Sequence, residues 1–380
     1  MVNSSVSRSQ QQRAWININH QAFIHNVQAI KSLLAPNTKF MAVIKADAYG
    51  HGVISVANTI LKNGVDAVAI ATLSEGIELR ENGVTAPILI LGAINAIEEI
   101  EQIVEYNIEP TICTTEQASI FTDYLASIST PLKVHLKLDT GMSRLGTNWE
   151  HALPFVRSVQ ECKYLDIRSI YSHLATADDE DPTFMELQLS RFEQTIANLK
   201  SANIDIPLLH FANSAATLYD RQYHYGMVRV GLALYGAYPA PHLRSQVKLI
   251  PPLEVKARIT QIKTLPANTG VSYSHTYKTE KETKIAIVGI GYADGVPRLL
   301  SNRMEVIVGG ELAPQIGNIT MDQLMIDVSN IPNLQVGEVV TILGKEGELE
   351  ISADDWANTI GTISWEIFCG FKNRLPRINK

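Results

Sequence analysis

The sequence predicts an α/β protein with an N-terminal (β/α)8 TIM-like barrel and a C-terminal, mainly antiparallel β domain. Eight short apolar runs alternate with longer amphipathic segments between about residues 39 and 232, and strand–helix alternation is typical of a parallel sheet. After about Gly236 the segments become short, β-branched and separated by Gly, Pro, Asn and Asp. This pattern of short segments and turn residues favours antiparallel strands.

The elements follow in a regular order along the chain. A helical pattern from Ala22 to Leu34 ends before Pro36 and precedes the first strand. The apolar runs predict barrel strands at 39–45, 67–71, 88–91, 110–113, 132–138, 168–172, 208–211 and 228–230. Helical patterns lie between them at 53–61, 74–80, 97–106, 116–125, 149–159 and 186–199. The β domain is expected to contain strands at 254–265, 284–290, 304–308, 323–328 and 339–343.

Length and composition bound the domain organisation and the class of protein. A chain of 380 residues is long for one domain, so we expect a polar, disordered tail at 1–13, the barrel at 14–240 and the β domain at 241–380. The net charge of −7, without a basic patch, argues against nucleic acid as a partner. No apolar stretch approaches the roughly 20 residues of a membrane helix. The three cysteines lack the spacing of a disulfide framework or a zinc site and favour the cytoplasm.

Polar residues follow the predicted strands, where the chemistry of such barrels collects. They are Lys45 after the first strand, Lys137 and Arg144 at the fifth, His173 after the sixth, Asn213 and Ser214 after the seventh, and Arg229 and Gly231 around the end of the eighth. Five strand ends therefore bring unusual side chains to one mouth.

Each of these residues has a structural alternative. Lys45 is either a solvated strand-end lysine or a partly desolvated amine able to form a Schiff base with a carbonyl. His173 is either a hydrogen-bonded structural histidine or a functional one. Ser214 can cap a helix or help to bind a phosphate. Arg229 stands between apolar residues, and a buried charge there needs a partner.

At this point the chain resembles the alanine racemases, enzymes with a pyridoxal 5'-phosphate cofactor, a barrel and a β domain. The resemblance extends from about Trp15 to Pro376. It rests on six segments in the family's order, at 42–52, 139–146, 210–216, 271–273, 291–295 and 321–323.

The resemblance implies a two-base racemisation of alanine in a homodimer with shared active sites, supplying D-alanine for peptidoglycan. Lys45 would hold the cofactor covalently and act as one acid/base, and Tyr273 of the partner subunit would be the other. The other residues implied to bind the cofactor are Tyr49, His173, Ser214, Arg229, Gly231, Leu232 and Trp365. Arg144 and the Met321 backbone would hold the substrate carboxylate. Lys137 matches a lysine that is carbamylated in many relatives, and Asp178, Tyr292 and Arg298 match an access corridor. The resemblance implies no metal.

Two departures from the family pattern bear on substrate range. Trp365 stands where the family usually has a tyrosine, and an indole N–H donates but cannot accept a hydrogen bond. Asn318 and Thr320 replace the arginine and cysteine common before Met321. A racemase with broader or serine-shifted specificity is therefore an alternative. A decarboxylase of the same barrel type and a non-enzymatic pyridoxal-phosphate-binding barrel fit less well, because neither gives Tyr273 and its domain a role.

Overall fold

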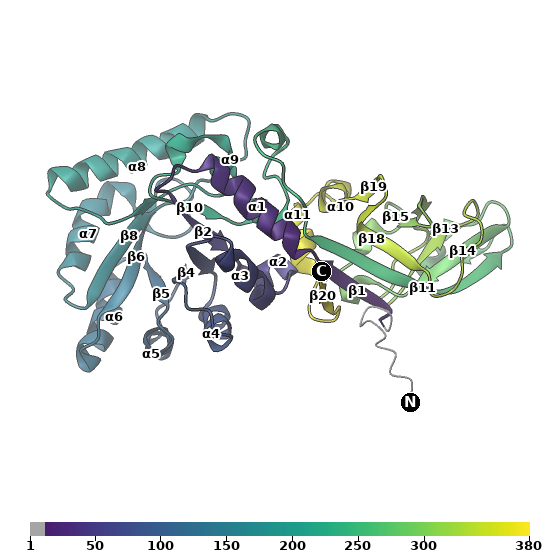
Figure 1. Ribbon diagram of the computed structural model, residues 1–380, viewed down its shortest axis with the longest axis horizontal. Helices are drawn as coiled ribbons and strands as arrows, with labels where there is room; N and C mark the ends of the chain where they lie inside the picture. The colour runs from purple at the N-terminus through teal and green to yellow at the C-terminus, as the bar shows by residue number, and fades with distance from the viewer. Residues whose placement is uncertain (1–11) are drawn as a thin grey trace. The chain divides into compact units, whose positions relative to one another are not determined.

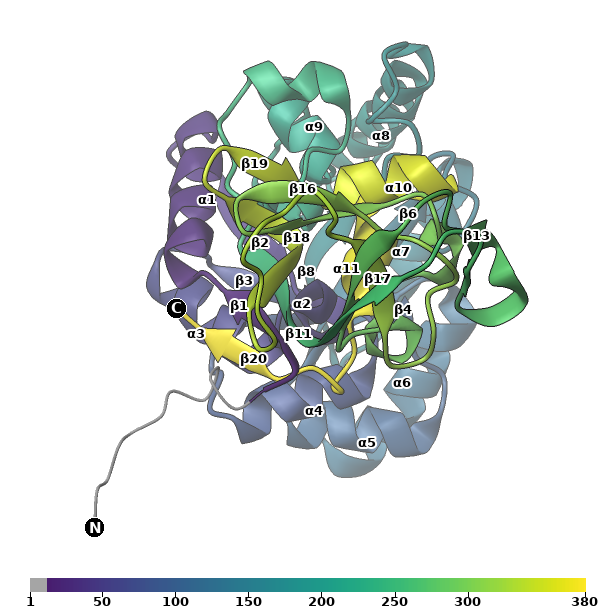
Figure 2. The ribbon, with the colours of Figure 1, turned by 90° about the vertical axis from the view of Figure 1, so that its right-hand side faces the viewer.

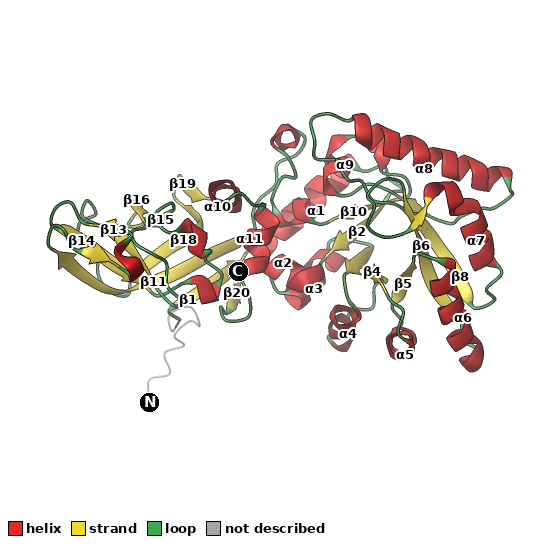
Figure 3. Cartoon of the chain, turned by 180° about the vertical axis from the view of Figure 1, so that it is seen from behind, coloured by secondary structure: helices red, strands yellow, loops and turns green. Residues whose placement is uncertain are grey.

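The computed structural model describes residues 12–380, which form two compact units. One unit contains residues 22–48 and 53–250, and the other contains the described residues 12–21, 49–52 and 251–380. Figure 3 distinguishes the helix-rich first unit from the second, in which strands predominate.

The first unit is a closed barrel of parallel strands. Within the described chain its eight strands are β2 (Lys39–Val43), β3 (Ala67–Ile70), β4 (Ile88–Ala93), β5 (Glu109–Ile112), β6 (Leu132–Asp139), β8 (Leu165–Tyr171), β9 (Leu209–His210) and β10 (Met227–Val230). Pairing of β10 with β2 and of β5 with β6 completes the ring. Strands β3 and β10 are buried along their whole length, as expected where helices cover a parallel sheet.

Helices follow the barrel strands and lie outside them (Figure 1). They are α3 (Val53–Lys62), α4 (Leu73–Glu81), α5 (Ile97–Glu105), α6 (Thr115–Ile128), α7 (Ala152–Gln160), α8 (Thr183–Ser201) and the short α9 (Ser214–Tyr219). Helix α1 (His20–Leu33) precedes the first barrel strand, and the short turn α2 (Lys45–Gly50) follows it. Thr114 caps α6 through its side chain, and Asn213 caps α9 in the same way.

The second unit is built mainly on antiparallel strands, whose labels can be found in Figure 2. The long strand β11 (Leu253–Leu265) pairs with β1 (Ala14–Ile18), β14 (Thr283–Val288) and β18 (Val339–Glu346). The remaining strands are β12 (Gly270–Val271), β13 (Tyr277–Lys278), β15 (Glu305–Val308), β16 (Glu311–Pro314), β17 (Leu324–Asp327), β19 (Leu349–Ile351) and β20 (Arg377–Asn379). Two helices, α10 (Ala353–Ile360) and α11 (Ser364–Gly370), belong to the same unit.

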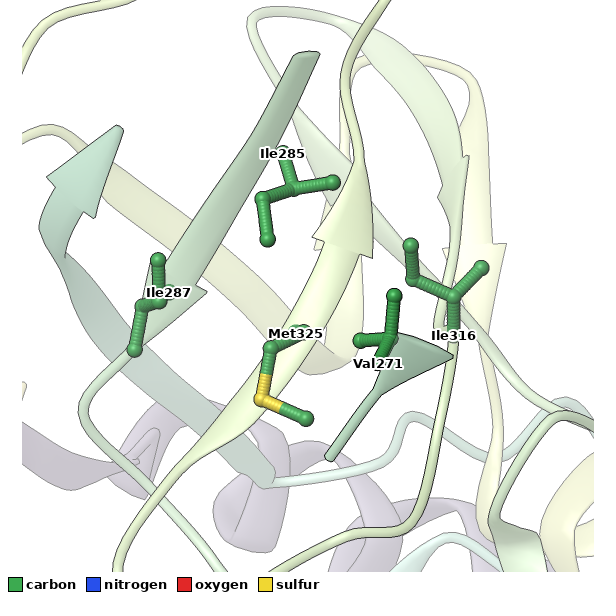
Figure 4. Packing of buried hydrophobic residues seen from close by; sticks show 5 residues of the cluster. All are labelled: Val271, Ile285, Ile287, Ile316 and Met325. Atoms are coloured by element: carbon green, nitrogen blue, oxygen red, sulfur yellow. The ribbon is translucent and has the colours of Figure 1, made fainter. Parts of the chain in front are cut away.

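A small apolar cluster lies beside strand β12 in this unit. Val271, Ile285, Ile287, Ile316 and Met325 pack together (Figure 4). The same strands line a groove of about 690 Å³ that reaches Ser272. The cluster therefore supports the backbone that leads into Tyr273.

The fold class predicted from the sequence is confirmed. The predicted barrel range, 14–240, begins too early, because β1 pairs with β11 and β20 in the sheet of the other unit. Residues 49–52 also cluster with that unit. The predicted tail lies outside the described residues except for residues 12 and 13. Among residues 12–380, no helix has the length and apolarity needed to span a membrane.

Candidate functional site

Lys45 lies two residues beyond β2, on a backbone turn of unusual handedness. From Ala46 to Tyr49 each φ lies between +52° and +54°, which costs non-glycine residues about 1–2 kcal/mol apiece. Glu75 braces the turn, because its carboxylate accepts the Ala46 N–H at 2.6 Å and the Ala71 N–H at 2.7 Å. Asp47 accepts the Val53 N–H at 2.7 Å. These carboxylates hold the strained backbone that carries Lys45.

Arg229 is a buried cation held by neutral acceptors. Its side chain donates to the Ser172 carbonyl at 2.6 Å, the Phe211 carbonyl at 3.2 Å and His210 Nδ1 at 3.0 Å. His173 Nδ1 lies 3.4 Å from the same guanidinium. Burial lowers the pKa of Arg229 to about 10, despite the opposing influence of Tyr171. Arg229 therefore stays positive at neutral pH.

The titratable neighbours of Arg229 have lowered pKa values. Burial, followed by the positive charges of Lys137, Arg229, Arg144 and Lys45, lowers the pKa of His173 well below its usual value. Burial and the charge of Arg229 likewise lower the pKa of Lys137. The Lys137 amine lies 4.4 Å from the centre of the Tyr171 ring. The barrel mouth thus combines a fixed cation with a weakly basic amine and an imidazole.

Ser214, which follows β9, lies beside the predicted residues Gly231 and Leu232, which follow β10. Its hydroxyl oxygen accepts the Gly231 N–H at 2.9 Å and the Ala233 N–H at 3.4 Å. Leu232 begins the short 3₁₀ helix η4 (Leu232–Tyr235) between those two residues and is buried. Because the oxygen receives both N–H groups, the hydroxyl proton remains available to an anionic acceptor.

Arg144 lies in a loop that β6 and Asp139 organise. The Asp139 carboxylate accepts the Gly141 N–H at 2.9 Å and the Ser143 N–H at 3.1 Å. Arg144 and Asp139 line a cleft of about 510 Å³ together with Cys113. Asp178, the predicted corridor residue of this unit, is exposed beyond β8. The structure thus brings Lys45, Lys137, Arg144, His173 and Arg229 near enough for their charges to interact, and joins Ser214 to Gly231.

Tyr273 belongs to the other unit and is 72% exposed. It begins the 3₁₀ turn η6 (Tyr273–His275), and Ser272 before it has φ of +62°. Asn318 fixes this backbone at two points: its side chain donates to the Tyr273 carbonyl at 2.7 Å, and its own carbonyl accepts the Ser272 hydroxyl at 2.7 Å. The departure noted at position 318 is therefore a buried amide that supports Tyr273.

The loops that carry Tyr292 and Met321 are paired. The Tyr292 N–H donates to the Thr320 carbonyl, and the Ala293 N–H donates to the Met321 carbonyl, each at 3.0 Å. Buried Asp294 stabilises the first loop by accepting the Gly291 N–H at 2.9 Å and binding Arg13 at 2.7 Å. Both Tyr292 and Met321 remain exposed.

The remaining predicted residues of this unit lie in separate segments. Tyr49 precedes Gly50, whose carbonyl accepts a hydrogen bond from Arg377 at 2.9 Å. Burial, together with nearby Cys369, raises the pKa of Tyr49 to about 12. Trp365 is half-buried on α11, and Arg298 is exposed on the 3₁₀ turn η8 (Arg298–Leu300).

Sequence reasoning overlooked three residues that support these groups. Glu75 reads as an ordinary polar residue of a helical first turn, and only the structure reveals its contact with the Lys45 turn. His210 stands in a segment that carried the resemblance, yet its bond to Arg229 was not foreseen. Asn318 was noted only as a departure. A histidine inside a predicted barrel strand is the one signal that could have been followed.

The fold and these residues define a two-domain class in which a (β/α)8 barrel with a cation-rich mouth is followed by an antiparallel β domain. The family model described as alanine racemase, N-terminal domain matches residues 18–239, and the model for the C-terminal domain matches residues 252–379. An alanine racemase from Nostoc sp. is 57% identical over 369 residues, covering 97% of this chain and 96% of the relative.

Solved structures agree with this relation. An alanine racemase of Clostridium difficile 630 superimposes with a TM-score of 0.92 at 34% identity, covering 97% of this chain and 96% of the other. A histidine racemase from Leuconostoc mesenteroides gives a TM-score of 0.89 at 28% identity, with coverage of 97% and 98%. The chain belongs to the alanine racemase family, as the sequence motifs predicted.

Proposed function

We propose that the protein interconverts L- and D-alanine with pyridoxal 5'-phosphate as its cofactor. The observation that carries the proposal is the placement of Lys45 and a hydrogen-bonded, buried Arg229 at one barrel mouth, beside His173 and Lys137. Such a mouth suits a ligand that combines a carbonyl carbon, an aromatic nitrogen and an anionic group. The identity of 57% to the Nostoc alanine racemase supports alanine as the substrate.

The donor set of the barrel fits this cofactor. The Ser214 hydroxyl, which receives the Gly231 and Ala233 N–H groups, is free to donate its own proton to a phosphate oxygen. We assign the phosphate to Ser214, Gly231 and Leu232, together with Tyr49 and Trp365. Arg229 would face the ring nitrogen and, as a fixed cation, would disfavour protonation there. When bound, the cofactor supplies an electron sink that acidifies the Cα proton of an amino acid.

Lys45 and Tyr273 are the proposed acid/base pair. Racemisation needs one group to take the Cα proton on one face and another to return a proton on the opposite face. Tyr273 stands 72% exposed on its own unit, which suits a residue that completes the site of a partner subunit in a homodimer. Asn318 holds the tyrosine's backbone in place.

Arg144 and the Met321 backbone are the proposed ligands of the substrate carboxylate, since a guanidinium binds that group in a bidentate manner. The depressed pKa of Lys137, caused first by burial, favours a neutral amine. A neutral amine can add to carbon dioxide and lose a proton, which yields a carbamate. We propose that this anion orients Arg144. Asp178, Tyr292 and Arg298 are the proposed access corridor, whose width, with Trp365, would set substrate range.

The test is a racemisation assay on the purified protein with added pyridoxal 5'-phosphate. We expect L-alanine to be converted to an equal mixture of enantiomers, with a kcat/KM well above those for L-serine and L-histidine. A preference for serine or histidine would replace alanine as the substrate, and formation of an amine with loss of carbon dioxide would identify a decarboxylase. Growth of a host that requires D-alanine would test the proposed supply of this amino acid for peptidoglycan.

A further inference from the structure

A chain of hydrogen bonds runs through the barrel interior, away from the mouth. Arg229 Nη1 lies 3.0 Å from His210 Nδ1, and His210 Nε2 lies 2.7 Å from Ser169 Oγ. The same oxygen lies 2.6 Å from His135 Nδ1, and His135 Nε2 lies 2.7 Å from Glu109 Oε2. The members come from β10, β9, β8, β6 and β5 in turn. The chain ends at Glu109, the first residue of β5.

This series of hydrogen-bonded side chains occupies a barrel interior that is usually apolar. Branched apolar side chains fill most barrels of this type, whereas His210 and Ser169 are fully buried here and His135 is 3% exposed. Buried polar groups are tolerated when each finds a partner. The Tyr171 ring stacks on His210 with centres 4.7 Å apart, and its hydroxyl lies 2.7 Å from Thr111 Oγ1. The imidazole is therefore held in one orientation.

The two ends of the chain dictate the direction of every hydrogen bond. Arginine can only donate, so His210 Nδ1 must accept. Burial, followed by the charge of Arg229, lowers the pKa of His210, and the neutral ring then carries its proton on Nε2. That proton points at the Ser169 oxygen. At the other end, Glu109 is a carboxylate that can only accept when ionised. When the neutral His135 ring donates from Nε2 to Glu109, its Nδ1 has no proton and accepts the Ser169 hydroxyl proton.

We propose that Glu109, His135 and Ser169 are positioning residues that fix the tautomer of His210 and, through it, the orientation of Arg229. The proposal rests on the proposed function for its effect on catalysis, because Arg229 is the residue assigned to the cofactor ring. Reversing the chain would place an N–H of His210 against an N–H of Arg229. The guanidinium would then lose one of the acceptors that make its buried charge tolerable.

Two substitutions at Glu109 distinguish the effect of hydrogen-bond direction from the effect of altered side-chain packing. Glu109→Leu removes the acceptor, so His135 gains by moving its proton to Nδ1 and donating to Ser169. This reversal conflicts with the demand of Arg229 at the other end. Glu109→Gln keeps a carbonyl oxygen for His135 and should preserve the direction. Ser169→Ala interrupts the chain in the middle.

The readout is the ¹⁵N spectrum of the histidine side chains of the cofactor-loaded protein, together with kcat and KM for L-alanine. We expect Nε2-protonated rings at His135 and His210 in the wild type and in Glu109→Gln. In Glu109→Leu the resonances of both rings should change, although His210 does not touch residue 109. The kcat of Glu109→Leu and Ser169→Ala should fall about tenfold, with KM within about twofold.

Thr195→Val is the matched control, because it removes a buried hydroxyl on α8 that donates to the Arg191 carbonyl, away from the chain. It should leave kcat and the two rings unchanged. An Nδ1-protonated His210 in the wild type would overturn the proposal, as would an unchanged His210 in Glu109→Leu or equal losses in Glu109→Gln and Glu109→Leu. Because the spectra report the tautomers without turnover, they test the proposed series of hydrogen bonds even if the wild type fails to racemise alanine.

Discussion

Replacing Gly291 by alanine tests whether the paired loops of the β domain position Met321 for substrate. Gly291 has an extended backbone with φ of −153°, which any residue can adopt. A Cβ built there would lie 2.2 Å from the Thr320 carbonyl oxygen and 2.5 Å from that of Met321. A close contact between carbon and oxygen needs about 3.3 Å. The loops must therefore move apart by about 1 Å.

This movement has a structural and a catalytic consequence. It would break the two backbone hydrogen bonds that join Tyr292 to Thr320 and Ala293 to Met321, at a cost of about 1–3 kcal/mol in unfolding free energy. A displacement of about 1 Å in a group that positions substrate can lower the rate about 100-fold. We therefore expect Gly291→Ala to lose about two orders of magnitude in kcat/KM for L-alanine.

The assay is steady-state racemisation of L-alanine, with thermal unfolding measured in parallel. Gly370→Ala is the control, since a Cβ there would meet only the Gly295 carbonyl at 3.6 Å, an ordinary contact distance. It should retain wild-type kinetics. A Gly291→Ala protein with wild-type kcat/KM would refute the role assigned to these loops.

Three further predictions follow from other parts of the site. Tyr273→Phe should slow one of the two proton transfers at Cα more than the other, measured as unequal losses in the removal of the Cα proton from L- and D-alanine, and equal, negligible effects on both would count against two bases. An inactive Lys45 variant mixed with an inactive Tyr273 variant should regain some activity on subunit exchange, and no regain despite proven exchange would place both bases in one chain. Asn318→Ala should lower kcat about tenfold through loss of its buried hydrogen bond to the Tyr273 carbonyl. A kcat equal to that of the wild type would show that Asn318 does not position Tyr273. Burial lowers the pKa of His173 and His210 in the folded state, so the unfolded protein binds more protons below about pH 6.5. The free energy of unfolding should therefore fall as the pH falls from 6 to 5, by at most about 1.4 kcal/mol per pH unit for each ring. His210→Gln should show a smaller fall in urea unfolding between those two pH values, and an unchanged slope would contradict the assignment.

Most of the fold could be predicted from the sequence, because each barrel strand is recognisable from a local pattern of residues. Apolar runs such as Lys39–Val43 are bounded by turn residues and alternate with amphipathic helices, and each needs only its own neighbours to be recognised. Residues 14–18 were assigned to the barrel range and not recognised as a strand, because the partners of β1, strands β11 and β20, lie far along the sequence. Helices α10 and α11 were not predicted, because they lie in a region whose short β-branched segments and turn residues otherwise indicate strands.

The candidate site divides in the same way. Lys45, Arg144 and Arg229 were predicted together because strand ends of a parallel barrel meet at one mouth. The groups that hold them were not foreseen. The turn after Lys45 places non-glycine residues at positive φ, which no local propensity predicts. His135 and Ser169 look like ordinary strand residues until the strands are closed into a barrel.

The central claim is that Lys45 binds pyridoxal 5'-phosphate and exchanges the Cα proton of alanine. The most direct test compares the wild type with Lys45→Ala, measuring the absorbance of lysine-bound cofactor and the exchange of the Cα proton of L-alanine with deuterium from solvent. We predict that the wild type shows both the absorbance and the exchange, and that Lys45→Ala loses both while remaining folded. Exchange at the wild-type rate in folded Lys45→Ala would contradict the account.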